Sequence, residues 1–249
     1  LIMKIQFRPM LWPSIFSIIT FIILCGFGTW QIKRLYWKEA LIQRYITESQ
    51  SKPISNLSEV SKSKVNEFKA VEISGKFLHN NEIYITGKTY EGNAGFHVVT
   101  PFKMENNKIV LINRGWVSEG YKNPNKRKFS LVKGKVKLKG IIRYPQKKGY
   151  FVPENDGENG FWFTIVPNQI FNFIKINTNS VVKDYYIDAL RLGEKITLPI
   201  GVDGKPNLRN QHLSYAITWY GLALSLLFVY FSYHVSSGRL IFIKNKRNG

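Results

Sequence analysis

Two uncharged stretches decide the architecture of this chain. They are residues 9–32, PMLWPSIFSIITFIILCGFGTWQI, and residues 210–238, NQHLSYAITWYGLALSLLFVYFSYHVSSG. Neither stretch contains Lys, Arg, Asp or Glu. An apolar run of about 18 or more residues is long enough to cross the hydrocarbon core of a bilayer as a helix. The sequence therefore predicts two transmembrane α-helices, at residues 10–32 and 212–236.

The segment between the two stretches is polar and long enough to form a domain with its own core. It contains short runs of β-branched and aromatic residues, separated by clusters of Gly, Pro, Asn or Lys. These runs predict strands at residues 68–74, 82–89, 96–102, 109–113, 136–142, 161–166 and 180–190. Such spacing is typical of a closed barrel or a sandwich. We therefore predict a membrane protein in which two transmembrane α-helices flank a mainly-β (barrel or sandwich-like) extracytoplasmic domain at residues 67–211.

The remaining segments connect these parts. Trp30, Arg34, Trp37 and Leu41 are spaced at i, i+4, i+7 and i+11, so the first helix is expected to continue beyond its apolar part. Residues 33–66 then form a helix extension and a linker, with the helix fading by Ser49. A short helix is predicted at residues 168–175, after Pro167, and an exposed polar loop at residues 119–130.

The short flanks of the two stretches predict the orientation. Residues 1–9 and the tail 237–249 contain Lys and Arg but no Asp or Glu. Short basic flanks stay on the cytoplasmic side of a membrane, whereas long domains cross largely regardless of charge. We expect both termini to be cytoplasmic and the domain to be periplasmic, in a bacterial inner (plasma) membrane. A mitochondrial inner membrane is less favoured, because no Arg- and Ser-rich transit peptide precedes the first stretch.

Composition excludes several classes of function. The net charge of +20 comes from scattered lysines and arginines, without a basic and aromatic module of the kind that binds nucleic acid. Anionic lipid or an acidic partner is the simpler explanation. The single cysteine, Cys25, excludes an intrachain disulfide and a cysteine-based metal site. The common motifs of hydrolases, nucleotide-binding enzymes and zinc proteases are absent, so we predict no enzyme, with an unusual membrane-anchored hydrolase as a remote alternative.

His212 is the most informative candidate for a functional residue. Tyr215 and Trp219 follow it at i+3 and i+7, so the three residues are expected to share a helix face at the outer end of the second span. Ionisable residues at membrane depth are costly and are often functional. A neutral imidazole between aromatic walls can be an axial haem ligand. The alternative is an ordinary interfacial histidine in a belt of aromatic residues.

The first helix carries a corresponding group at its outer end: Trp30, Gln31, Arg34 and Trp37. An arginine there can pair with carboxylates of a bound ligand and stack on a tryptophan. The alternative is that these residues are membrane anchors, with a tryptophan at the interface and an arginine that reaches toward water.

The domain contains one further motif, Asn113-Arg114-Gly115-Trp116-Val117. We expect it to end a strand, with Gly115 in a turn or bulge and Trp116 covering the barrel, which is a role in packing. His79 and His97 lack the spacing of metal ligands and are expected to be surface or satisfied core residues. His234 is expected at the inner membrane interface.

Three motifs together resemble the surfeit locus protein 1 family, a family of assembly factors for haem–copper cytochrome c oxidase. They are Gly28-x-Trp-Gln-x-x-Arg-x-x-Trp-Lys38 after the first span, Asn113-Arg-Gly-Trp-Val117 in the domain, and His212-Leu-x-Tyr-Ala-x-x-Trp-Tyr-Gly221 at the start of the second span. The resemblance covers the chain in order, including its two spans.

The resemblance implies that the protein aids maturation of subunit I of the oxidase by binding or delivering haem a, with partners among the proteins of haem a biosynthesis. It implies that His212 is the axial ligand of the haem iron. We add that Tyr215, Trp219 and Trp30 line the ring and that Arg34 pairs with a propionate. The alternative is a cofactor-free scaffold or chaperone that docks oxidase subunits, with helix packing through small residues such as Gly221 and Ser225.

Overall fold

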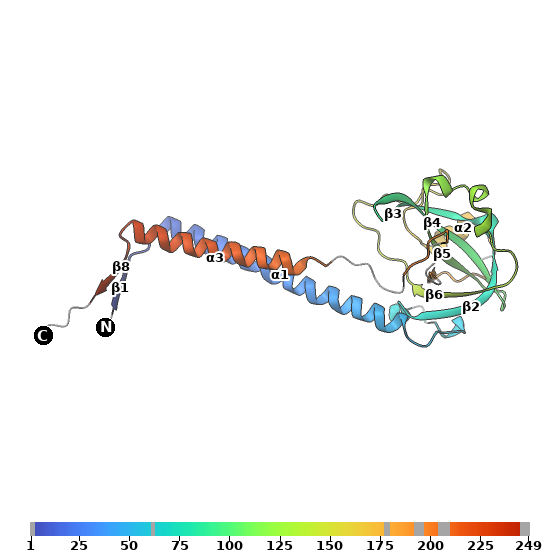
Figure 1. Ribbon diagram of the computed structural model, residues 1–249, viewed down its shortest axis with the longest axis horizontal. Coiled ribbons are helices and arrows are strands. Elements are labelled where there is room, and N and C mark those ends of the chain that lie inside the picture. Colours follow the sequence, from blue (N-terminus) through green and yellow to red (C-terminus); the bar gives the residue numbers. More distant parts are fainter. Residues whose placement is uncertain (1–2, 61–62, 177–179, 192–196, 204–209, 245–249) are drawn as a thin grey trace. The chain divides into compact units, whose positions relative to one another are not determined.

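The computed structural model describes residues 3–60, 63–176, 180–191, 197–203 and 210–244. The chain divides into two compact units, Leu1–Ile42 with Asn207–Gly249, and Gln43–Pro206. The first unit is built on two long helices, and the second is a mainly-β domain (Figure 1). This confirms the predicted architecture of two long apolar helices that flank a mainly-β domain.

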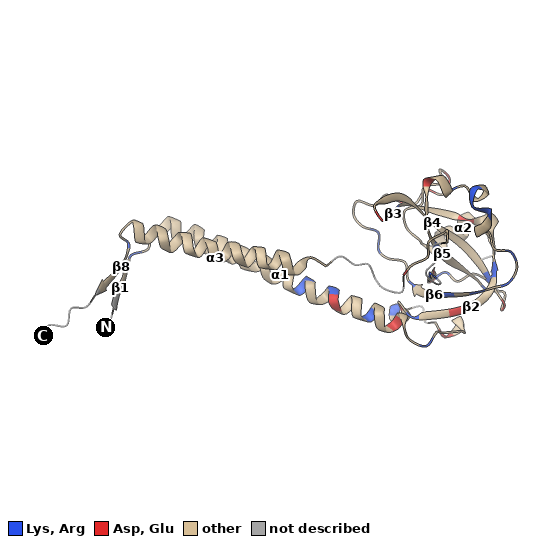
Figure 2. Ribbon diagram, viewed as in Figure 1, with Lys and Arg blue, Asp and Glu red and all other residues tan. Residues whose placement is uncertain are grey.

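Helices α1 (Leu11–Ser49) and α3 (His212–Ser236) lie side by side in Figure 1. Both are long and apolar enough to cross a membrane, and very little of the apolar segment of either helix is buried within the chain. Their outward surfaces are therefore apolar and exposed, as at Ile18 (59% exposed) and Leu224 (69% exposed). Figure 2 shows that the charged residues of α1 begin only beyond this stretch. The helix ends at Ser49, where the sequence predicts that it fades.

The two helices approach closely through small residues. Gly28 on α1 is buried, and a Cβ atom there would lie 2.8 Å from a ring carbon of Tyr220 on α3. Ala216 and Ala223 on α3 are 1% and 2% exposed. Small side chains let two helix backbones come together in a lipid environment, where packing replaces the hydrophobic effect as the driving force. The hydroxyl groups of Thr29 and Tyr220 add a hydrogen bond of 2.9 Å beside this contact.

A two-stranded sheet that the sequence analysis did not predict joins the two ends of the chain. Strands β1 (Met3–Phe7) and β8 (Leu240–Lys244) pair antiparallel. His234, which we expected at the membrane interface, is fully buried beside this sheet. Met3–Phe7 alternates between apolar and polar residues, whereas Leu240–Lys244 is a short apolar run, and the basic residues of both segments predict only flanks of the spans.

The β domain contains six strands in one sheet. They are β2 (Ala70–Phe77), β3 (Ile83–Tyr90), β4 (Asn93–Met104), β5 (Ile109–Ser118), β6 (Val136–Arg143) and β7 (Tyr186–Ala189). The strand order is β2-β6-β7-β5-β4-β3, and β2 also pairs with β4. Five strands therefore close into a ring, and β3 extends it as a hairpin with β4. All pairs are antiparallel except β5 with β7.

Strand β5 is buried on both faces and forms the centre of the domain. Val110 and Ile112 pack in one core cluster with Phe102. Ile109 and Leu111 point into a second cluster, which contains residues of the short helix α2 (Pro167–Phe173). A strand covered on both faces has a continuous apolar run instead of an alternating one. This explains the sequence Ile-Val-Leu-Ile at its start, and α2 lies where a short helix was predicted.

The predicted strand at 161–166 is wrong, apart from isolated bridges. The side-chain oxygen of Asn155 accepts hydrogen bonds from the backbone N–H groups of Phe163 (2.9 Å) and Thr164 (3.1 Å). These donors are then not available to a neighbouring strand. In the predicted strand 180–190, only Tyr186–Ala189 is a strand among the described residues.

The segment 119–130, predicted as an exposed loop, is exposed at most of its positions but is more ordered than predicted. It forms two 3₁₀ helices, Glu119–Tyr121 and Pro124–Ser130, and Arg127 within it is fully buried. Further 3₁₀ helices lie at Leu57–Glu59, Lys64–Asn66 and His79–Asn81.

Gly115 provides a direct test of the barrel geometry. It lies at a bulge between β4 and β5 with φ of +110°, and a Cβ atom there would lie 1.8 Å from the carbonyl oxygen of Ile200. We expect Gly115→Ala to lower the free energy of unfolding by at least about 2 kcal/mol, because both the backbone conformation and the space exclude a side chain.

The matched control is Gly120→Ala, where a Cβ atom meets nothing within 4 Å. Urea unfolding of the full chain in detergent, followed by proteolysis of the β domain, measures both variants. Equal effects of the two substitutions would contradict the assigned role of Gly115.

Candidate functional site

The candidate site in the helical unit is built around His212, the first residue of α3. Its Nδ1 atom lies 2.7 Å from the side-chain oxygen of Gln31 on α1. Gln31 is 8% exposed and is thereby held in place. An amide oxygen only accepts hydrogen bonds, so in the neutral ring this contact places the proton on Nδ1 and leaves the lone pair on Nε2. This is the form in which an imidazole binds a metal, with the other nitrogen oriented by a neighbour.

The other predicted residues of α3 divide between two faces. Trp219 is partly buried and stacks on Phe27 of α1, with ring centroids 4.9 Å apart. Tyr215 is 54% exposed. The face toward α1 follows His212, Ala216, Trp219 and Ala223, in steps of four and three, so position 215 falls outside it. Phe27 is a contact that the sequence analysis missed, because no local pattern links it to Trp219.

The predicted residues of α1 lie on its outer surface. Trp30 is 53% exposed. Arg34 is exposed, and its guanidinium carbon lies 4.4 Å from the ring centroid of Trp37. The structure thus brings His212 to Gln31 and Trp219 to Phe27, while Tyr215, Trp30 and Arg34 present exposed surface.

These residues fit a haem better than a bare metal ion. Within the described part of the chain, no three His, Cys, Asp or Glu side chains gather as a ligand set. A haem supplies four equatorial nitrogens itself and needs only an axial ligand from the protein. The Nε2 atom of His212 fits that role, and exposed aromatic rings on both helices offer apolar surface to a flat macrocycle.

The β domain contains a buried cluster of charged residues around Glu82, whose side chain is 2% exposed. Arg114 donates to Oε1 at 2.9 Å, and Arg127 donates to Oε2 at 2.5 Å. The hydroxyl of Tyr84 adds a third donor at 3.0 Å. Burial alone acts to raise the pKa of Glu82, but Arg127 and Arg114 outweigh it and hold this pKa below its ordinary value. The carboxylate is therefore charged and balances two arginines.

The same arginines fasten the loop after β5. Arg114 also donates to the carbonyl oxygen of Ser130, and Arg127 donates through Nε to the carbonyl oxygen of Tyr121 at 2.9 Å. His79 completes the cluster, with Nδ1 3.2 Å from Glu82 and Nε2 3.1 Å from the carbonyl oxygen of Val132. His79 is thus a satisfied residue, which its sequence context predicted. The cluster holds the loop and offers no open reaction centre.

A second polar cluster lies around Asp188 on β7. Asn113 donates to it at 2.7 Å, and Arg143 lies 3.4 Å away. Burial raises the pKa of Asp188, although Arg143 and Asn113 oppose the shift. His97 has Nδ1 3.3 Å from the amide nitrogen of Asn113. Burial, followed by the charge of Lys88, lowers the pKa of His97 to about 4, so this histidine is neutral at pH 7.

The motif Asn113–Val117 therefore contributes residues to both polar clusters. Asn113 contacts Asp188, Arg114 contacts Glu82, and Gly115 admits the backbone of Ile200. Trp116 exchanges backbone hydrogen bonds of 2.8 Å with Ile200 in both directions, and its indole N–H donates to the carbonyl oxygen of Lys88. The packing role expected for this motif fits these contacts. The motif forms the second half of β5 and ends one residue before the strand does, at Ser118, with Gly115 at the expected bulge.

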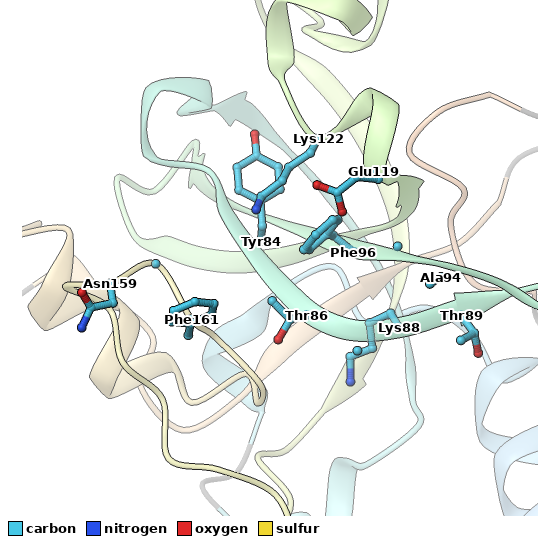
Figure 3. Close-up of a pocket in the computed structure, with 13 residues that line it drawn as sticks. Tyr84, Thr86, Lys88, Thr89, Ala94, Phe96, Glu119, Lys122, Asn159 and Phe161 are labelled. Carbon is cyan, nitrogen blue, oxygen red and sulfur yellow. The ribbon is translucent and has the colours of Figure 1, made fainter.

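A shallow groove of about 690 Å³ lies on the β domain between β3, β4 and residues 159–161 (Figure 3). Its lining is mainly apolar and includes Phe96 and Phe161. The ammonium group of Lys122 lies 4.3 Å from the ring centroid of Phe96. This combination suits an apolar segment that carries an acidic group near Lys122.

Comparison with known proteins identifies relatives of this chain. A family model described as "SURF1 family" matches residues 18–224. A SURF1-like protein from Rickettsia felis is 32% identical over 87% of this chain and 94% of its own length. Surfeit locus protein 1 from Mus musculus is 32% identical over 83% of this chain and 70% of its own length. The region matched by the family model includes the β domain, most of α1, the first half of α3 and the candidate residues from Trp30 to Trp219.

Glu82→Gln tests the buried charged cluster. The substitution removes the charge that two buried arginines share, and we expect it to lower the free energy of unfolding by about 3 kcal/mol or more. The control is Glu105→Gln, because Glu105 is 56% exposed in its ion pair with Lys135, and such pairs contribute about 1 kcal/mol or less. Urea unfolding of the full chain in detergent compares the two. Similar losses of unfolding free energy in the two variants would show that the buried charge of Glu82 contributes no more to stability than an exposed one.

His97 predicts a pH dependence of stability. Its pKa is 6.5 in its ordinary state and about 4 in the fold, so between these values the unfolded chain binds a proton that the folded chain does not. The contribution of His97 is present above pH 6.5 and is lost as the pH falls toward 4, with a slope of up to about 1.4 kcal/mol per pH unit.

The measurement is the difference in unfolding free energy between the natural protein and His97→Gln, which lacks this titration. We expect the difference to change in favour of His97→Gln as the pH falls from 6.5 to 4. A difference that stays constant over this range would contradict the buried, neutral state of His97.

Proposed function

Because the chain belongs to the SURF1 family, whose members are assembly factors for cytochrome oxidase and not enzymes, we propose that it aids the maturation of subunit I of a haem–copper oxidase. In this proposal the protein binds haem a at the end of its helix pair where α3 begins, and His212 is the axial ligand of the iron. The observation that carries the proposal is the hydrogen bond of 2.7 Å between His212 and Gln31.

This contact supports the proposal through its effect on the imidazole. With its proton on Nδ1, the ring presents Nε2 as a neutral ligand. Partners of the second nitrogen fix the orientation and basicity of metal-bound histidines, and their loss typically costs about 10- to 100-fold in affinity. Gln31 is buried, so it orients the ring before any ligand arrives. A membrane anchor with no further role does not need this arrangement.

The remaining predicted residues bind the rest of the macrocycle. Tyr215 and Trp30 offer exposed aromatic surface, and Trp219 supports the helix pair behind them through Phe27. Arg34 lies one helical turn beyond Gln31 and is exposed, so its guanidinium pairs with a haem propionate.

The proposal includes a placement in the membrane. Residues 10–32 and 212–236 span the bilayer, residues 1–9 and 237–249 are cytoplasmic, and residues 33–66 lead to the periplasmic domain at 67–211. Its support is the apolar surface of both helices and the basic composition of both flanks. Haem a then binds at the outer face of a bacterial inner membrane, within reach of subunit I and of the proteins that make haem a.

A cofactor-free scaffold is the second candidate function. Gly221 on α3 faces outward, and a Cβ atom there meets nothing within 4 Å. Ser225 is also exposed one turn further along the helix. A helix of an oxidase subunit could pack against these small residues, while the mainly apolar groove beside Lys122 binds an apolar segment that carries an acidic group. Co-purification with oxidase subunits that survives the loss of haem would favour this function.

The test is the absorption spectrum of the full chain, purified in detergent from cells that make haem a. We expect His212→Ala to lower the haem a content at least about tenfold and Gln31→Leu to lower it less, since the ligand remains but loses its orienting partner. Leu213→Ala, at the adjacent exposed position, is the control and should keep its haem. All three variants should still insert in the membrane. Unchanged haem in His212→Ala would exclude this ligand, and a colourless natural protein would favour the scaffold.

A further inference from the structure

The two ends of the chain form a ribbon whose position and chemistry indicate a partner. Strands β1 and β8 pair antiparallel from Met3↔Lys244 to Phe7↔Leu240, and the N–H of Arg8 extends the pairing by donating to the carbonyl oxygen of Arg239 at 2.8 Å. An isolated two-stranded ribbon is marginally stable in water. Stability therefore requires a further surface on at least one face of this ribbon.

The ribbon has two different faces. Cross-strand partners lie on the same face of a sheet, and successive residues alternate between faces. Ile5, Phe7, Leu240 and Phe242 share one face, which is apolar except at its end, where Lys244 pairs with Met3. Gln6, Arg8 and Arg239 share the other face with Ile241 and Ile243. Ile5 is 62% and Phe242 is 55% exposed, so nothing within the described chain covers the apolar face at these positions.

His234 fastens the ribbon to the end of the helix pair. Its Nδ1 donates to the carbonyl oxygen of Tyr230 at 2.8 Å, and its Nε2 accepts from the backbone N–H of Met10 at 3.2 Å. The ring of Phe7 packs against His234, with centroids 5.4 Å apart. The hydroxyl groups of Ser14 and Tyr230 add a hydrogen bond of 2.6 Å. The ribbon is therefore held where both helices end, which is the level of the lipid headgroups if the helices span a bilayer.

We propose that the β1–β8 ribbon docks on the anionic lipid headgroups of the leaflet next to it. The apolar face enters the boundary between headgroups and acyl chains, and Arg8 and Arg239 on the opposite face contact phosphates. The sequence supports this charge complementarity, because residues 1–10 and 237–249 contain six lysines and arginines, Lys4, Arg8, Arg239, Lys244, Lys246 and Arg247, and no acidic residue. This inference depends on the proposed membrane placement and is independent of haem binding.

Depth measurements with spin labels test the two faces separately. Phe242→Cys and Ile241→Cys, each in the full chain with Cys25→Ala, place a label on the apolar face and on the basic face. The protein is reconstituted in vesicles of phosphatidylcholine with one third phosphatidylglycerol, and in vesicles of phosphatidylcholine alone. In the anionic vesicles we expect the label at 242 to be several-fold more accessible to oxygen than to a water-soluble nickel complex, and the label at 241 to show the reverse. The contrast should shrink without the anionic lipid.

A label at position 19, introduced as Ile19→Cys, separates the two hypotheses. Ile19 is 51% exposed in the middle of the apolar part of α1. If the helices span the bilayer, this label is accessible to oxygen in both kinds of vesicle. Accessibility of position 19 to nickel would overturn the membrane placement itself. A lipid-exposed position 19 with positions 241 and 242 equally open to nickel would overturn only the docking of the ribbon.

Two further measurements test whether lipid covers the ribbon. Hydrogen exchange of the unlabelled protein requires no substitution in the ribbon, and the amides of β1 and β8 should exchange more slowly in the anionic vesicles. Equal exchange in both lipids would contradict the proposal. Spin–spin broadening at position 242 in dilute vesicles would show that a second copy of the chain, and not lipid, covers the apolar face.

Discussion

The close approach of α1 and α3 at Gly28 is the constraint on which the helical unit depends. A Cβ atom at this position would lie 2.8 Å from the ring of Tyr220, so glycine allows this ring to lie against the backbone of α1. Gln31 lies one turn beyond Gly28, and His212 lies two turns before Tyr220 on the antiparallel partner. The register that is set at Gly28 therefore brings the amide of Gln31 to the imidazole of His212. At the opposite end, His234 and the paired strands β1 and β8 fix the same register through backbone hydrogen bonds.

In the β domain, buried charged groups connect the strands and the loops. Glu82 joins β3 to Arg114 of β5 and to Arg127 of the following loop, and Asp188 joins β7 to Asn113 and Arg143. Buried ion pairs of this kind give little net stability compared with apolar packing, but the removal of one partner is costly. These buried pairs determine which strands and loops pack together. Apolar residues alone would permit several pairings of these segments, whereas the charged groups permit one.

Local patterns in the sequence were sufficient for the helices and for most strands. The uncharged stretches, the i, i+4, i+7 spacing after Trp30 and the short β-branched runs are properties of neighbouring residues, and they predicted the fold class. Long-range contacts leave no such pattern. Nothing near Arg127 indicates that it is buried against Glu82, and nothing near Asn155 indicates that it replaces a strand partner for Phe163. The site shows the same division: His212 and Gln31 were recognised separately, but their contact and the outward position of Tyr215 depend on how the helices pack.

The protonation state of His212 is the central claim, because it links the helix register to a ligand for iron. Nitrogen-15 NMR of the full chain in detergent, without haem and with labelled histidine, measures this state directly, and His212→Ala identifies the signal. The account predicts a proton on Nδ1 and a free lone pair on Nε2, with Gln31→Leu abolishing this preference. A proton on Nε2 in the natural protein would contradict the account, because the nitrogen that is proposed to face the iron could then not bind it.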